Sequence, residues 1–285
     1  MKEKKRMRRH RFLEKMPVTA SVLTALLGLI PTSVIVYLAQ MLAPAYVAAG
    51  TLVGLLLGVL LTAALYRLWF RPEFEGLLRG GKLGRGFLLG LFIAVYWALG
   101  MVLPILFTDR ETSSKLTAEV IANASQAGFL EELCFRGLLL GSLLRVWKVD
   151  KRFLPAALVA GLVFGLAHGF NVLSGADPVQ TVLQVLQTIV VGIFFSAVYI
   201  RCGNLWPLIF YHTLHDILAI SLSPEVNVNG VITGVVTWLN YADLGASLIL
   251  GVVGIWLLRR EKTEEIRALW DQKWKKPSLS AEPEL

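Results

Sequence analysis

Long apolar stretches alternate along this chain with short polar links. Most of these stretches reach the length of about 20 residues with which an α-helix crosses a hydrocarbon core of about 30 Å. The pattern predicts roughly eight membrane-spanning helices. We expect them at residues 18–42, 46–70, 87–107, 122–144, 153–173, 179–200, 205–222 and 231–258. The predicted fold class is therefore all-α, a polytopic transmembrane helical bundle.

Basic residues mark alternate links between the expected spans. They are Arg71, Arg79, Lys82, Arg85, Lys148, Lys151, Arg152, Arg201, Arg259 and Arg260, on the same side as the basic N-terminus. The opposite links are short or of mixed sign, with Asp109, Arg110, Glu111, Lys115 and Glu225. Lysine and arginine are enriched in cytoplasmic links. We therefore expect an integral multi-pass protein of a bacterial-type cell membrane, with cytoplasmic N- and C-termini.

The composition agrees with a lipid environment. Of the 285 residues, 55% are hydrophobic and 17% are charged, and the mean hydropathy is +0.63, which is too apolar for a soluble globular domain. The net charge of +8 indicates no nucleic-acid partner, because the basic residues lie beside hydrophobic segments. The two cysteines, Cys134 and Cys202, predict neither a disulfide framework nor a cysteine zinc site, and Cys134 is expected to serve packing.

The spans and links divide the chain into successive parts. These are a basic cytoplasmic N-terminus (1–17), N-terminal transmembrane helices (18–116), a core with the candidate chemistry (117–222), the last transmembrane helix (223–260) and a cytoplasmic amphipathic tail (261–285). In the tail, the apolar residues Ile266, Leu269, Trp270 and Trp274 recur at helical spacing, which predicts a helix on the cytoplasmic membrane surface. Within the core, Gly161 and Gly165 are spaced to let two helices approach closely.

Ionisable side chains inside a span are costly, which makes each of them a functional candidate. The fourth expected span contains Glu131, Glu132 and Arg136. Glu132 and Arg136 stand four residues apart, in the order that favours an ion pair, while Glu131 points about 100° away. We therefore expect Glu132 and Arg136 to be structural and Glu131 to face a membrane-embedded polar site. The alternative is a buried ion-pair network that only locks two helices.

Histidines occupy two further spans. In the fifth, Phe164 and His168 share a face, so the phenyl ring can orient the imidazole, although a lone histidine there also suits plain packing. In the seventh, His212, His215 and Asp216 fall within about 100° of one face. The aspartate can alternatively serve only to fix the tautomer of one imidazole.

These residue types suit peptide-bond hydrolysis, which needs a base to activate water and donors to stabilise the oxyanion. Glu131 and His168 fit the first task, and His212 fits the second. A transporter that uses Glu131, His168 and Asp216 as a proton relay or cation site employs the same residue types, although the sequence has no evident repeated halves. A non-catalytic immunity or scaffold protein with a polar core is the third hypothesis.

Taken together, the three motifs resemble the CAAX protease and bacteriocin-processing (CPBP) family of intramembrane glutamate endopeptidases. In family order and on separate spans, the match consists of Glu131-Glu132 with Arg136, Phe164 with His168, and His212 with Asp216. The resemblance implies that Glu131 and His168 activate water and that His212 and Asp216 stabilise the oxyanion. The supporting residues are then Glu132, Arg136 and Phe164. It also implies partners: the lipid bilayer, and peptide or lipidated protein substrates.

Asp216 is the position that keeps a second mechanism open. Some members of the family have asparagine there, which donates a hydrogen bond, whereas an ionised aspartate cannot. Asp216 must therefore be protonated, or orient His212, or help to bind a cation. In the last case Glu131, His168, His212 and Asp216 would hold Zn²⁺ as in a metalloprotease. We favour the metal-free mechanism and expect no cofactor.

Overall fold

The computed structural model describes residues 12, 14–69, 80–107, 116–147, 151–223, 226–234 and 236–273, and most of them are helical. The α-helices are α2 (Pro17–Leu42), α3 (Val47–Trp69), α4 (Leu83–Gly90), α5 (Ile93–Trp97), α6 (Leu103–Phe107), α7 (Ala118–Glu131), α8 (Gly141–Trp147), α9 (Phe153–Ala167), α10 (Pro178–Cys202), α11 (Trp206–Leu222), α12 (Trp238–Leu257) and α13 (Thr263–Lys273). Short helical segments of other pitch join them, namely η1 (Pro44–Tyr46), η2 (Ala98–Val102), η3 (Glu132–Leu140), η4 (His168–Ser174) and η5 (Arg260–Lys262). In the described ranges, the isolated bridge between Val226 and Ile232 is the one piece of β-structure.

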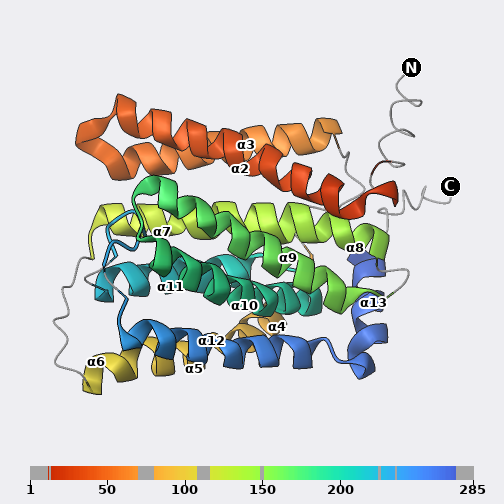
Figure 1. Ribbon diagram of the computed structural model, residues 1–285. Helices are drawn as coiled ribbons and strands as arrows, with labels where there is room; N and C mark the ends of the chain where they lie inside the picture. The colour runs from red at the N-terminus through yellow and green to blue at the C-terminus, as the bar shows by residue number, and fades with distance from the viewer. Residues whose placement is uncertain are drawn as a thin grey trace.

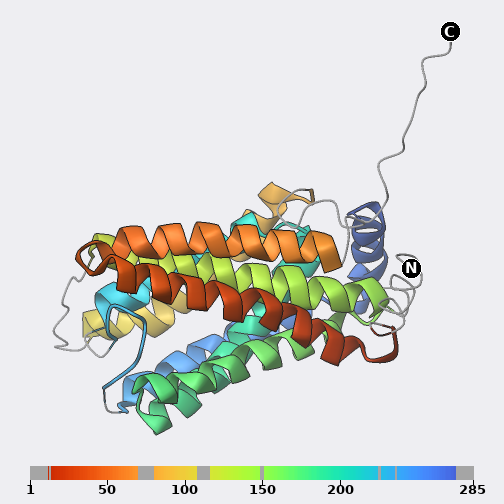
Figure 2. The same ribbon diagram turned by 90° about the horizontal axis from the view of Figure 1, so that it is seen from above.

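The long helices lie side by side in one bundle, and α13 runs across one end of it (Figure 1). The hairpin of α2 and α3 covers one side, and α12 with α4 to α6 forms the opposite side. Between them lie α7 with its continuation η3–α8, then α9, α10 and α11. Seen from above, α13 again lies at the end of the bundle (Figure 2).

Among the described residues, six helical stretches are long and apolar enough to cross a membrane. They are Pro17–Leu42, Pro44–Ala64, Leu83–Val102, Phe153–Ser174, Pro178–Cys202 and Trp238–Leu257. The other two expected spans are also helical: α7–η3–α8 carries the buried charges, and α11 has 17 residues. An all-α polytopic bundle is therefore confirmed, while the number of eight spans and their orientation stay predictions.

The last span begins later than the sequence pattern indicated. We expected a start at residue 231, but α12 begins at Trp238, with Thr237 and Asn240 forming a capping box. The preceding residues instead form a compact loop, in which Asn227 N–H donates to the Val231 carbonyl and Ile232 bridges Val226. Turn formation at Gly230, which has φ of 77°, prevails there over an apolar composition that also suits a helix.

Two packing predictions are confirmed. A Cβ atom on Gly161 would lie 2.9 Å from the Ile189 carbonyl oxygen, and one on Gly165 would lie 2.8 Å from the Val185 carbonyl oxygen, so α9 and α10 touch through backbone. Cys134 is fully buried and is a free cysteine.

One end of the bundle is tied together by hydrogen bonds between helix ends. Lys82 N–H donates to the Cys202 carbonyl at 2.6 Å, and Arg201 donates to the Leu257 carbonyl at 2.9 Å. From α13, Trp270 donates to the Ile200 carbonyl at 2.9 Å. We call this region, residues 80–85, 151–152, 200–205 and 257–273, the basic end.

The amphipathic helix of the tail is confirmed over Thr263–Lys273, while its expected position on the membrane surface stays a prediction. Ile266, Leu269 and Trp270 are buried, and the Trp270 ring contacts that of Tyr199 at 5.3 Å between centroids. The apolar face is therefore covered by the protein, because the end of the bundle offers it a well-packed apolar surface. On its polar face, Glu264 pairs with Lys151 and Glu265 with Arg85.

Some predicted features lie outside the described residues. They are the basic segment 1–11, the links at 71–79, 108–115 and 148–150, Glu225 and Trp274.

Candidate active site

A cavity of about 530 Å³ occupies the half of the bundle that lies away from α13. Its walls come from α2, η2, α7, α9–η4, α10, α11, α12 and the loop at 226–232. At this end, Asn123 of α7 donates to the Val228 carbonyl at 3.0 Å, and Asp177 N–H, before α10, donates to that of Ile232 at 3.3 Å. We call this region, residues 117–123, 171–184, 219–223 and 226–243, the cavity end.

Capping residues in the sequence determine where the helices that carry the site begin. The hydroxyl of Thr117 caps α7 by accepting from Val120 N–H, and the carboxylate of Asp177 caps α10 by accepting from Val179 and Gln180. Asn204 accepts from Trp206 N–H at 3.0 Å, and Pro207 stands in the first turn of α11. These caps fix where each helix starts, and hence which side chains reach the cavity.

The two adjacent glutamates face different surroundings. Glu131 ends α7 and lines the cavity with a quarter of its side chain exposed, whereas Glu132 begins the π-helical segment η3 and is fully buried. Arg136 Nη1 donates to Glu132 Oε1 at 3.0 Å, as the spacing of four predicts. The expected division of the pair is therefore confirmed in its geometry. Segments of π-helix are rare and occur frequently at functional sites.

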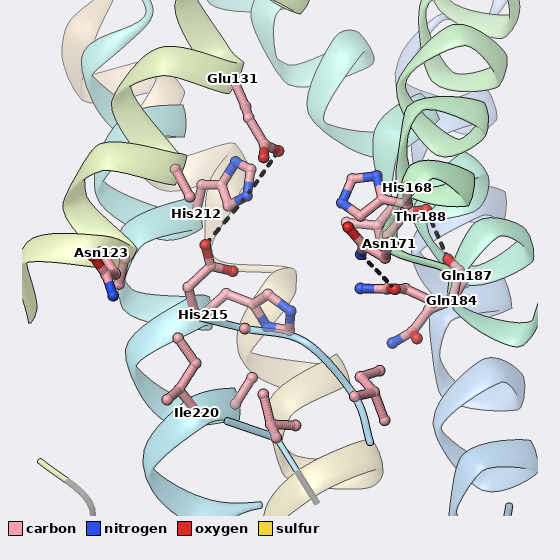
Figure 3. A pocket seen from close by; sticks show the side chains of 18 of the residues that line it. Asn123, Glu131, His168, Asn171, Gln184, Gln187, Thr188, His212, His215 and Ile220 are labelled. Carbon is pink, nitrogen blue, oxygen red and sulfur yellow. Dashed lines mark hydrogen bonds and ion pairs between the residues drawn. The ribbon is translucent and has the colours of Figure 1, made fainter. Parts of the chain in front are cut away.

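His212 joins the buried ion pair to the cavity. Its Nδ1 lies 2.8 Å from Glu132 Oε1, and its Nε2 lies 3.7 Å from both Glu131 Oε2 and Asp216 Oδ2. Because the Glu132 carboxylate pairs with Arg136 and accepts only, Nδ1 is the nitrogen that donates to it. The Nε2 face is directed toward the cavity, between Glu131 and Asp216 (Figure 3).

His168 lies on the opposite wall of the cavity from Glu131 and His212 (Figure 3). Its Nδ1 is 3.0 Å from the Phe164 carbonyl oxygen, one helical turn earlier. The Phe164 ring packs edge-on against His168, with centroids 4.8 Å apart, and against His212 at 6.0 Å. The guanidinium of Arg136 stacks 4.2 Å from the same ring. The expected contact between Phe164 and His168 is confirmed, and the ring also contacts His212 and Arg136.

One carboxylate oxygen of Glu131 lacks a hydrogen-bond partner. Within the described part of the chain, Glu131 Oε2 is buried and has no such partner, and it lies 3.7 Å from His212 Nε2. His168 lies on the far wall of the cavity that Glu131 lines. A buried carboxylate oxygen without a partner is costly unless water or substrate pairs with it. The four predicted residues, Glu131, His168, His212 and Asp216, all line this one cavity.

His215, to which the sequence assigns no role, lines the same cavity on its α5–η2 side. Its Nδ1 accepts from the indole N–H of Trp97 at 3.2 Å, and its ring contacts Tyr96 at 5.6 Å between centroids. Accepting at Nδ1 places the ring proton on Nε2 in a neutral imidazole.

A second polar cluster in the cavity was missed by the sequence analysis. Gln187 donates to Asp243 Oδ2 at 2.6 Å and also contacts the hydroxyl of Tyr96. Asp243 lies in the last span, so the rule that marks ionisable residues in spans as candidates would have selected it. Gln187 and Tyr96 carry no such signal, because neutral polar residues in spans are common.

The side chains do not fit one metal ion as they lie. Throughout the described ranges, no group of three or more histidine, cysteine, aspartate or glutamate side chains could hold a metal ion. His168 in particular lies across the cavity from Glu131 and His212. Zinc therefore has no part in the mechanism that we propose.

The comparison with protein families concerns the same part of the chain. Residues 113–218 match the family described as Rce1-like, type II CAAX prenyl endopeptidase Rce1-like. The matched residues include all four predicted site residues, and the result agrees with the resemblance to the CAAX protease family. The matched family is one of peptidases, and the match lies in a multi-pass membrane protein. No curated protein matched the chain, and no solved structure did.

Proposed function

We propose that the protein is an intramembrane endopeptidase that hydrolyses peptide bonds of membrane-associated substrates. The observation that carries this proposal is the single cavity that Glu131, His168, His212 and Asp216 all line, with Glu131 and Asp216 both 3.7 Å from His212 Nε2. The Rce1-like match supports the reaction class. A general base and an oxyanion donor, held in a site lined by protein, are what peptide hydrolysis requires.

In this mechanism Glu131 accepts a proton from a water molecule bound in the cavity between its carboxylate and His168. The hydroxide so formed attacks the carbonyl carbon of the substrate peptide, and Glu131 then passes the proton to the leaving nitrogen. His168, held at Nδ1 by the Phe164 carbonyl, presents Nε2 to the same water. General acid–base transfer of this kind contributes about 10²–10⁴-fold to a rate.

His212 is the proposed oxyanion donor. With Nδ1 donating to Glu132, a neutral ring leaves Nε2 without a proton, so donation to the oxyanion requires the doubly protonated ring. Asp216 lies 3.7 Å from this Nε2. It acts either as a protonated donor beside His212 or as the group that keeps the charged ring in place. Glu132, Arg136 and Phe164 hold His212 and His168 in position.

The test uses purified protein in liposomes with a quenched-fluorescence peptide library. We expect cleavage by the unsubstituted protein and a loss of about 10²–10⁴-fold in Glu131→Gln, which keeps the shape and removes the base. His168→Ala and His212→Ala should also lose activity. Glu119→Gln, an acid near the start of the same helix and outside the cavity lining, is the matched control and should cleave normally. Undiminished cleavage by Glu131→Gln would refute the assignment.

Metal dependence is tested on the same preparation. We expect activity to survive a chelator, with no stoichiometric metal in elemental analysis. Loss of activity on chelation, with recovery on adding Zn²⁺ back, would replace this mechanism with the metalloprotease one.

A further inference from the structure

The histidines that line the cavity are held in two opposite ways. His168 and His212 each direct Nδ1 at a group that only accepts, a carbonyl oxygen at 3.0 Å and a carboxylate oxygen at 2.8 Å, so both rings carry a proton on Nδ1. His215 directs Nδ1 at a group that only donates, the indole N–H of Trp97 at 3.2 Å. Nδ1 of His215 is therefore unprotonated, and its ring is neutral with the proton on Nε2. Among the described histidines, His215 alone has this tautomer.

The neighbours of the His215 ring are themselves fixed by three helices. Tyr96, which precedes Trp97 in α5, is 2% exposed and packs against the His215 ring at 5.6 Å between centroids. The Tyr96 hydroxyl contacts Gln187 of α10, and Gln187 donates to Asp243 of α12 at 2.6 Å. A ring held in this way loses little freedom when it binds a further group, which lowers the cost of that contact.

The second nitrogen of His215, Nε2, is a donor without a partner. In the described part of the chain it makes no hydrogen bond, and the ring points from α11 into the cavity that it lines (Figure 3). Most buried polar atoms in proteins are paired. A histidine that served only to link α11 to α5 would use Trp97 and need no opening at its other nitrogen. The N–H of Nε2 is thus available to an acceptor that enters the cavity.

His215 stands close to the expected position of the scissile bond. In the proposed mechanism this bond lies at His212 Nε2, which is 3.7 Å from both Glu131 and Asp216. His215 follows His212 by three residues on the same face of α11, a rise of about 4.5 Å along the helix axis. An extended peptide advances about 3.3 Å per residue. A backbone carbonyl one or two residues from the scissile bond is therefore within range of the donor.

We propose that His215 is a substrate-binding residue of the peptidase site, which donates from Nε2 to a backbone carbonyl of the bound peptide beside the scissile bond. Trp97 is the positioning residue that keeps the proton on this nitrogen. The proposal rests on the proposed peptidase function. Because the acceptor is backbone, the contact holds the peptide in place whatever its side chains are.

Steady-state cleavage in liposomes tests the contact, with a peptide from the library that the unsubstituted protein cleaves. His215→Leu keeps the bulk and removes the donor. A contact that is equally strong in the ground state and the transition state changes KM alone, so KM should rise about 3–10-fold while kcat stays within about twofold. His215→Gln should restore most of the lost affinity, because its amide can accept from Trp97 and still donate to the peptide.

The positioning role has its own matched pair of variants. Trp97→Phe keeps a ring and removes the indole N–H, so the proton of His215 is no longer confined to Nε2, and KM should rise by about 2–3-fold. Trp206→Phe is the control, because Trp206 is 45% exposed and lies outside the cavity lining. An unchanged KM in His215→Leu, or equal effects of the two tryptophan variants, would overturn the proposal. If His215→Leu fails to fold, the tryptophan pair still decides.

The position of the proton is measured without any cleavage, by solid-state NMR of protein that carries ¹⁵N-labelled histidine in liposomes. The signals that disappear in His215→Gln belong to His215, and we expect a neutral ring with Nε2 protonated and Nδ1 unprotonated. Trp97→Phe should shift the Nδ1 signal, and Trp206→Phe should not. A proton on Nδ1 would overturn the proposal even if the peptide is cleaved. Absence of cleavage by the unsubstituted protein would refute the peptidase function, while the NMR result would still decide whether His215 is a neutral donor.

Discussion

The basic end and the cavity end are built from the same helices, yet they are filled differently. At the basic end, leucine, alanine and aromatic side chains are buried to within a few per cent, and α13 covers them. At the cavity end, the same α7, α9, α10 and α11 diverge around a volume of about 530 Å³ lined by amides, histidines and acids. The boundary between the two is the layer formed by Glu132, Arg136, Phe164 and His212.

This difference shows how a membrane protein can hold charged side chains inside the hydrocarbon core of the bilayer. The pair of Glu132 and Arg136 satisfies charge on the packed side of the boundary, and the adjacent Glu131 is left for the cavity. The packed half of the bundle keeps the pair of Glu132 and Arg136 away from water, and the open half contains the side chains that line the cavity. Changes on either side of the boundary should therefore affect different measurements.

The largest expected contrast lies between the two neighbouring glutamates. Glu132→Gln leaves the Arg136 guanidinium buried without a counter-charge, and breaking such a pair costs about 3–5 kcal/mol of folding free energy. Glu131→Gln leaves the pair of Glu132 and Arg136 intact and removes only the 3.7 Å contact with His212, so its unfolding free energy should fall less than that of Glu132→Gln, while cleavage is lost. Thermal unfolding in detergent measures the first effect, and equal stability losses in both variants would break the comparison.

A smaller effect is expected from a methyl group added to two glycines of the fifth span. In Gly161→Ala the new Cβ would meet backbone of α10, with Ile193 N at 2.9 Å, so overpacking should cost about 1–3 kcal/mol. In Gly169→Ala the nearest contact is Val185 Cγ2 at 4.0 Å, and the change should stay within about 0.5 kcal/mol. Unfolding of the two variants in one detergent compares them directly, and a larger loss in Gly169→Ala would contradict the assignment of open and packed halves.

The smallest effect concerns pH and the attachment of α13. The hydrogen bond from Arg85 lowers the pKa of Glu265 below its usual range. A carboxyl with a lowered pKa stabilises the fold above its unfolded pKa of about 4.3, and this contribution is lost as the pH falls through the folded pKa. Because the pair is partly exposed, it is worth about 0–1 kcal/mol. Unfolding of the unsubstituted protein and of Glu265→Gln between neutral and acid pH should converge at low pH, and a gap that widens there would reverse the sign.

Local sequence patterns were sufficient for much of the site. The pairing of Glu132 with Arg136 and the contact of Phe164 with His168 are both confirmed, because each joins residues one helical turn apart. The motifs also led to the family that the Rce1-like match supports. The start of the last span was wrong, since the apolar residues Val231 and Ile232 enter a loop that follows a turn at Gly230.

By itself, the sequence determined the all-α bundle, the expected polarity of its two ends and the residues to suspect, because these follow from apolar length, charge distribution and helical periodicity. Three hydrogen bonds were decided only by the tertiary structure. His212 donates to Glu132, Trp97 donates to His215, and Gln187 donates to Asp243. These contacts bridge different helices, and spacing along the chain carries no information about which helices are neighbours. For the same reason the sequence showed that α13 has an apolar face but not that protein, rather than lipid, covers it.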